Sequence, residues 1–132
     1  MVTEHNKLKG SIPPEITFLS DLTRLQFGGN KIKGVIPKQI GSMSNLESLC
    51  LQANALTGVI PRNVYELTGL SELNLAANKL NGGVRIEIEK MIELKSLNLA
   101  SNSFSSSIPS QMGSLQSLGE IFGSTICLTC FY

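Results

Sequence analysis

The sequence predicts a single domain that is a solenoid of stacked repeats. Five asparagines recur with 24 residues from one to the next: Asn6, Asn30, Asn54, Asn78 and Asn102. Leucines keep step with them in the pattern L-x-x-L-x-L-x-x-N-x-L, and a fixed period of this length is typical of solenoid proteins. One unit buries too few apolar side chains to offset the entropy lost in ordering its backbone, so neighbouring units must stack.

The start of each unit predicts a short strand. In the stretch "LESLCL", Leu49 and Leu51 are two residues apart, so an extended chain points both to one face. Ser48, Cys50 and Gln52 then point to the other face. We expect the first face to be core and the second to be solvent.

The middle of each unit predicts a turn. A buried asparagine amide supplies two donors and an acceptor to backbone groups that the turn leaves unpaired, so stacked units should form an asparagine ladder. Four residues later, where a tight bend or a positive φ is expected, stand Gly10, Gly34, Gly58 and Gly82. A proline lacks an N–H and suits the far side of the coil; these prolines are Pro13, Pro37, Pro61 and Pro109.

The pattern divides the chain into four full repeats and two flanking segments. A partial repeat covers 1–21, full repeats cover 22–45, 46–69, 70–93 and 94–117, and a degenerate repeat with a tail covers 118–132. After the proline position an apolar stripe should return to the core: Ile40, Val64, Ile88 and Met112 with Met43, Leu67, Met91 and Leu115. Arg85 replaces the proline of the third repeat, so we expect a looser turn there, and Ser106 replaces the glycine of the fourth.

The units "LTRLQFGGNKIKGVIPKQIGSMSN", "LESLCLQANALTGVIPRNVYELTG" and "LKSLNLASNSFSSSIPSQMGSLQS" resemble the plant-type leucine-rich repeat, which is distinguished by G-x-I-P after the asparagine and leucine. The match covers residues 6 to about 118. The resemblance implies an α/β-type leucine-rich-repeat solenoid: a curved right-handed coil with a parallel β-sheet on the concave face and irregular or 3-10 turns on the convex face. The family's caps are not recognisable and the chain starts inside a unit, so we expect a fragment of a longer array.

A binding site is expected on the outward-facing strand positions, because adjacent coils bring these into columns across which a ligand can lie. The columns contain Arg24, Ser48, Glu72 and Ser96, then Gln26, Cys50, Asn74 and Asn98, with Gln52 in the next. The alternative is an ordinary solvated strand face, since most surface residues contribute little binding energy and this surface has one arginine and no aromatic residue before Phe122. The concave face is nevertheless a better candidate than the convex one.

Catalysis finds little support in the sequence. His5 is the only histidine, so no histidine cluster for a metal or a histidine-based relay can form. Glu87, Glu89 and Glu93 lie close together in "RIEIEKMIE", a pattern that favours a solvated charged face over an acid–base pair. We therefore expect no catalytic residue, no metal, no cofactor and no enzyme activity.

The cysteines leave several interpretations open. Cys127 and Cys130 form "CLTC", which fits a redox pair, half of a zinc site or the remnant of a capping disulfide, although incidental residues of a frayed tail are favoured. Cys50 lies on the outward strand face, and no N-x-S/T sequon occurs. Both observations argue mildly against a disulfide-organised secreted domain.

Function and compartment follow mainly from the resemblance. It implies a non-enzymatic module that recognises a peptide or protein, in a receptor-like or secreted protein; the alternatives are an intracellular scaffold or inhibitor, or the recognition part of a receptor kinase. A formal charge of +1 and no strong basic patch disfavour nucleic acid. The resemblance places the chain outside the cell or at its surface, but no signal peptide or membrane-spanning segment is recognisable, so the compartment stays open, as does the oligomeric state.

Overall fold

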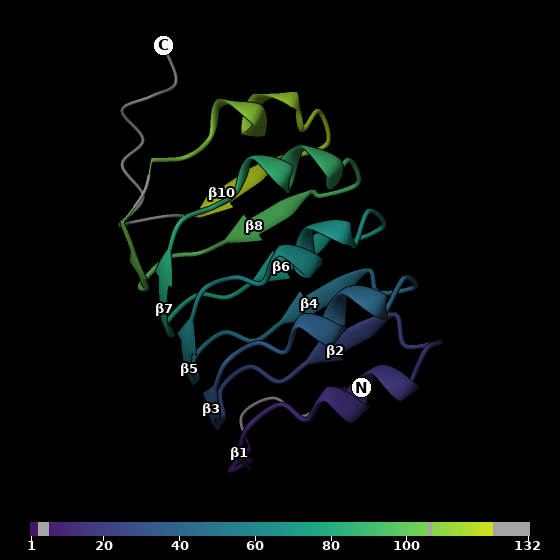
Figure 1. Ribbon diagram of the computed structural model, residues 1–132, viewed down its shortest axis with the longest axis vertical. Helices are drawn as coiled ribbons and strands as arrows, with labels where there is room; N and C mark the ends of the chain where they lie inside the picture. Colours follow the sequence, from purple (N-terminus) through teal and green to yellow (C-terminus); the bar gives the residue numbers. More distant parts are fainter. Residues whose placement is uncertain (3–5, 106, 123–132) are drawn as a thin grey trace.

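The computed structural model describes residues 1–2, 6–105 and 107–122, except for the side chains of residues 120–122. Successive turns of one coil stack along the long axis of the molecule (Figure 1). The predicted solenoid is therefore confirmed. His5, Ser106, Cys127 and Cys130 lie outside the described residues, so what the sequence predicts for them stays a prediction.

The parallel sheet predicted for the concave face is present. Its strands are β2 (Arg24–Gln26), β4 (Ser48–Cys50), β6 (Glu72–Asn74), β8 (Ser96–Asn98) and β10 (Glu120–Phe122), and each lies beside the strand of the next coil. Leu25, Leu49, Leu73 and Leu97 at the strand centres are at most 1% exposed. Alternation along the strand therefore directs these leucines into the core, as predicted.

A second parallel sheet, which the sequence pattern did not predict, follows the asparagines. Its strands are β1 (Lys9–Gly10), β3 (Lys31–Gly34), β5 (Ala55–Gly58), β7 (Lys79–Gly82) and β9 (Ser103–Phe104). In β3, Ile32 is buried while Lys31 and Lys33 on either side of it are exposed. One inward residue per strand is too short a pattern to identify a strand, so only the stacking of the coils reveals this sheet.

The predicted glycine conformation is confirmed at the ends of these strands. Gly10, Gly34, Gly58 and Gly82 have φ between +77° and +93°. This left-handed region costs a residue with a side chain roughly 1–2 kcal/mol. The glycines let the chain bend from the second sheet toward the far side of the coil.

Short 3-10 helices occupy that far side, as predicted. They are η1 (Pro14–Phe18), η2 (Lys38–Ser42), η3 (Arg62–Glu66), η4 (Ile86–Lys90) and η5 (Ser110–Ser114). Extended prolines precede all of them except η4, which follows Arg85. Arg85 is also extended, with φ −87° and ψ 157°, and η4 has the same five residues as the others. The expectation of a looser turn is wrong, because the hydroxyl of Tyr65 accepts a hydrogen bond from the Arg85 N–H at 3.3 Å and so satisfies the donor that proline lacks.

The core follows the predicted stripe. All eight residues that were expected to return inward after the proline position are at most 5% exposed. Each buried Leu, Ile, Val or Met contributes roughly 1.5–3 kcal/mol through burial. Within the described residues, no helix has the length and apolar character needed to cross a bilayer.

Candidate ligand-binding site

The strand register aligns the predicted site residues into two columns. We call the outward surface of the β2–β4–β6–β8 strands the concave face. Ser48 pairs with Arg24 on one side and with Glu72 on the other, and Glu72 pairs with Ser96. The same pairings place Gln26, Cys50, Asn74 and Asn98 in the second column. Neighbouring strands are about 4.8 Å apart, so each column offers closely spaced groups to one ligand.

Two residues of this face are not solvated as predicted. Ser48 and Cys50 are each 3% exposed. The Oγ atom of Ser48 donates a hydrogen bond to Oε2 of Glu72 at 2.7 Å, and it lies 3.5 Å from Sγ of Cys50. Small side chains in the middle of a sheet lie below the level of longer side chains from the adjacent coils. The sequence pattern was right about the face and wrong about the exposure.

The remaining predicted residues differ in exposure. Arg24 is exposed, while Gln26, Gln52, Glu72 and Ser96 are half-buried. The Glu72 carboxylate is held in place by its hydrogen bond from Ser48. The accessible groups of the first column are therefore a cation from β2, a carboxylate from β6 and a hydroxyl from β8.

Gln52 introduces a polar atom without a protein partner. Its amide lies over Gly28 of the preceding coil, where a Cβ would collide with it, so any larger residue at position 28 would displace the Gln52 side chain. The Oε1 atom of Gln52 is buried, and no described protein group donates a hydrogen bond to it. Buried acceptors are nearly always satisfied in native structures, so a donor from water or from a ligand is expected here.

Asn74 and Asn98 present equivalent amides from adjacent strands. Oδ1 of Asn74 accepts a hydrogen bond from the N–H of Ala76 at 3.2 Å, and Oδ1 of Asn98 accepts one from the N–H of Ala100 at 3.1 Å. These bonds orient the two side chains alike. Each oxygen is turned to its own backbone, so the NH₂ groups are the ends left to contact a ligand.

The asparagines assigned a structural role form the predicted ladder in four coils. Nδ2 of Asn78 donates to the carbonyls of Leu51 at 2.9 Å and Leu75 at 3.1 Å, while Oδ1 accepts from the N–H of Leu56 at 3.0 Å. Asn30, Asn54 and Asn102 make equivalent bonds. Asn6 is exposed, so the prediction of a buried amide is wrong for that residue.

The acidic run lies on the other side of the coil. Glu87 forms ion pairs with Arg62 at 3.3 Å and Arg85 at 3.2 Å, and its side chain is 14% exposed. The hydrogen bond from Arg85 holds the pKa of Glu87 below its ordinary value, and the same bond raises the pKa of Arg85. Glu89 is exposed, as is Glu93. The run is thus a charged surface, although Glu87 is more enclosed than predicted.

Tyr65 is a residue of this side that sequence reasoning missed. It is fully buried, and burial raises the pKa of its hydroxyl. The sequence indicates the need for such a residue, because Arg85 occupies the proline position of the next repeat and its N–H requires an acceptor. No group of three or more His, Cys, Asp or Glu side chains suited to a metal occurs among the described residues.

Family models match two parts of the chain. A model described as "Leucine rich repeat" matches residues 20–80, and a second with the same description matches residues 93–115. A search among curated proteins found no match.

Solved structures similar to this chain include ectodomains of plant receptor kinases from Arabidopsis thaliana and a plant ice-binding protein, which is 31% identical with a TM-score of 0.89, covering 94% of this chain and 41% of that one. The ectodomain of the receptor kinase SOBIR1 is 35% identical with a TM-score of 0.87, and the alignment covers 93% of this chain and 68% of that one. The GASSHO1/SCHENGEN3 ectodomain, solved with CASPARIAN STRIP INTEGRITY FACTOR 2, is 32% identical with a TM-score of 0.90, covering 93% of this chain and 15% of that one. The receptor kinase HAESA, solved with the peptide hormone IDA and the co-receptor SERK1, is 29% identical with a TM-score of 0.90, covering 92% and 21% respectively. The chain therefore spans between about a seventh and two thirds of the length of these solved chains.

Proposed function

We propose that this chain, which belongs to the leucine-rich repeat family, is a non-enzymatic recognition module that binds a peptide or protein through its concave face. The observation that supports this best is the register of the strands, which places Arg24, Glu72 and Ser96 in one column and Asn74 and Asn98 in the next. These side chains supply a cation, a carboxylate and amide donors, the groups needed to bind a polypeptide with both backbone and charged partners.

The unsatisfied acceptor of Gln52 supports the same proposal. Its Oε1, which is buried in this conformation, accepts a backbone or side-chain N–H of a polypeptide ligand once the Gln52 side chain turns outward. The HAESA structure, which contains a peptide hormone, supports a peptide as the ligand class. We assign the chain to a receptor-like or secreted protein on the same grounds; an intracellular scaffold or inhibitor that uses this face is the second candidate.

The experiment is a selection of random displayed peptides on the purified chain, followed by affinity measurement on two matched variants. Ser96→Arg places a long cation on β8 in the first column of the concave face, and Ser110→Arg places one at an exposed position of η5 on the other side. We expect selected peptides to bind Ser96→Arg roughly tenfold more weakly, or about 1.4 kcal/mol, and Ser110→Arg as well as the unchanged chain. Equal affinity for all three proteins would exclude the concave face as the site.

The sequence of the full transcript separates the two candidates. A signal peptide and cysteine-bearing caps around these repeats would support the receptor-like or secreted protein. Their absence from a complete transcript would support the intracellular scaffold.

A further inference from the structure

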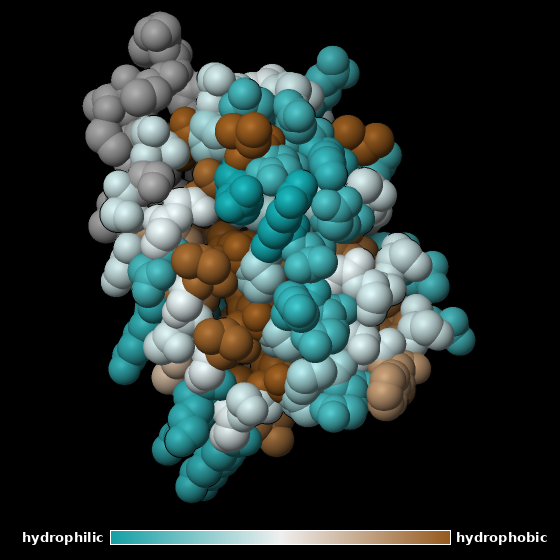
Figure 2. Space-filling model, in the orientation of Figure 1, coloured by the Kyte–Doolittle hydropathy of each residue, from teal (hydrophilic) through white to brown (hydrophobic). Residues whose placement is uncertain are grey.

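An apolar groove lies outside the concave face, between the second sheet and the 3-10 helices. Its volume is about 540 Å³, and its lining includes Ile12, Val35, Ile36, Val59, Pro37 and Pro61. Figure 2 shows it as a brown furrow between two hydrophilic margins. Val35 is 58% exposed and Val59 is 54% exposed. Two aliphatic side chains with this exposure, aligned in adjacent coils, leave apolar area that a partner would remove from water.

The two valines are held in position by the next coil. Cγ1 of Val35 lies 3.1 Å from the place that a Cβ at Gly58 would occupy, and Cγ1 of Val59 lies 2.9 Å from the corresponding place at Gly82. Each valine therefore fills the space that a glycine leaves open. A groove whose walls are already packed loses little side-chain entropy when a partner binds.

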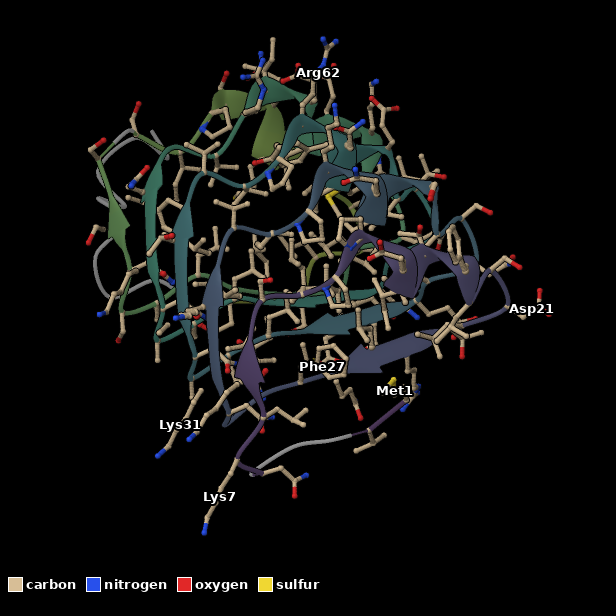
Figure 3. The ribbon with its side chains drawn as sticks, turned by 60° about the horizontal axis from the view of Figure 1, so that its bottom comes forward. Met1, Lys7, Asp21, Phe27, Lys31 and Arg62 are labelled. Atoms are coloured by element: carbon tan, nitrogen blue, oxygen red, sulfur yellow. The ribbon has the colours of Figure 1, made fainter. Side chains whose placement is uncertain are left out.

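Lysines lie in this groove and on the adjacent strands β1 and β3 of the second sheet. Lys9 of β1 and Lys31 of β3 are register partners, Lys33 follows in β3, and Lys38 at the start of η2 lines the groove. Lys7 and Lys31 extend from the same end of the molecule, whereas Asp21 lies at its opposite side (Figure 3). The ion pairs of the described residues involve Arg62, Arg85 and Lys90, and none of these lysines.

The charge of the chain is unevenly distributed along the solenoid. Residues 6–46 contain six basic and two acidic side chains, whereas residues 47–94 contain four basic and six acidic ones. The formal charge of +1 hides this asymmetry, and the spacing of the lysines between positions 7 and 38 hides the patch from a linear search. Like charges opposite each other in a sheet are destabilising, so an anionic partner relieves a repulsion that the free chain contains.

We propose that this groove docks an extended acidic segment of a partner polypeptide. Aliphatic side chains of that segment lie over Val35 and Val59, and its carboxylates pair with Lys9, Lys31 and Lys33. The two features of the surface select this occupant together. A nucleic acid or a polyanion pairs with the lysines but has no aliphatic side chains for the groove, and the groove has no aromatic residue on which a base can stack.

The test uses a fluorescein-labelled, end-blocked peptide of four Glu-Val pairs, titrated with the full chain by fluorescence anisotropy. Two further peptides, of Glu-Ser pairs and of Lys-Val pairs, separate the apolar from the ionic contribution. Val59→Ser removes an apolar side chain of the groove, and Lys33→Glu reverses a positive charge of the second sheet. Ile86→Ser and Lys95→Glu make similar changes at other exposed positions and serve as controls. Circular dichroism and Tm establish that every variant is folded.

We expect the Glu-Val peptide to bind, and the two groove variants to weaken it roughly tenfold each while the control variants change it less than about twofold. Failure of the Glu-Val peptide to bind, equal binding of the Glu-Ser peptide, or equal losses in the control variants would overturn the proposal. Self-association in sedimentation that Val59→Ser and Lys33→Glu abolish would also overturn it, because a second copy of the chain would then fill the groove. Ser96→Arg leaves the peptide's affinity unchanged, so this result is independent of the concave face.

Discussion

The asparagine ladder makes the strongest prediction about stability. Asn78→Ala removes an amide whose Oδ1 accepts the N–H of Leu56 at 3.0 Å and whose Nδ2 donates to Leu51 at 2.9 Å and Leu75 at 3.1 Å. Alanine preserves the backbone and deletes these bonds, together with a longer one from Nδ2 to the carbonyl of Ala76 at 3.3 Å. Asn78 is 9% exposed, so water reaches the site poorly.

The loss of stability in Asn78→Ala depends on which hydrogen bonds the former partners of Asn78 keep. The carbonyl of Leu51 keeps a hydrogen bond from Asn54 at 3.1 Å, and that of Leu75 keeps one from Asn102 at 2.9 Å. The N–H of Leu56 has no such replacement, and a buried unsatisfied donor costs about 1–3 kcal/mol. With the net loss of the remaining bonds, we expect the free energy of unfolding to fall by about 3 kcal/mol. For a chain of this length that corresponds to a decrease in Tm of roughly 10 °C.

The assay is urea and thermal unfolding followed by circular dichroism, with Asn81→Ala as the matched control. Asn81 is exposed on β7 in the same coil, so its truncation should change stability by less than about 0.5 kcal/mol. Similar losses in both variants, or a negligible loss in Asn78→Ala, would refute the bonding role of the ladder.

Three further predictions concern the turns. Tyr65→Phe leaves the N–H of Arg85 without its acceptor and should lower the free energy of unfolding by roughly 1–3 kcal/mol. Adding Arg85→Pro should recover much of this stability, because proline has no N–H. Additive effects of the two substitutions in a double-mutant cycle would contradict this. Gly82 has φ +77° and lies against Val59, so Gly82→Ala should destabilise the protein by roughly 1–2 kcal/mol or more. Gly69→Ala should not, because a Cβ added there would have no atom within 4 Å. Equal Tm values for the two variants would count against the strain argument. Because the pKa of folded Glu87 lies below its ordinary value of 4.5, ionised Glu87 stabilises the fold at pH values above 4.5, and this stabilisation is lost as the pH falls through the folded-state pKa. Glu87→Gln should therefore reduce the difference in the free energy of unfolding between pH 6 and pH 3. An unchanged difference would refute this.

Much of the scaffold was predictable because it repeats. A residue that recurs at one period has the same neighbours in every coil, so Leu49 and Leu73 must be inward and Asn54 and Asn78 must bond alike. The same logic identified which strand residues share the concave face. It did not extend to the residues that differ between coils, and those include Arg24, Glu72 and Gln52 among the candidates for ligand contact.

Sequence alone thus determined the solenoid, its core positions and the columns of the concave face, because strand alternation and the repeat period are local properties. Only the tertiary structure decided the burial of Ser48 and Cys50, the bond from Arg85 to Tyr65 and the lysine-edged groove. Each of these features depends on the length, charge or hydrogen-bonding capacity of side chains that differ from one coil to the next. Such contacts join residues about one repeat apart, and stacking of the coils is what brings them together.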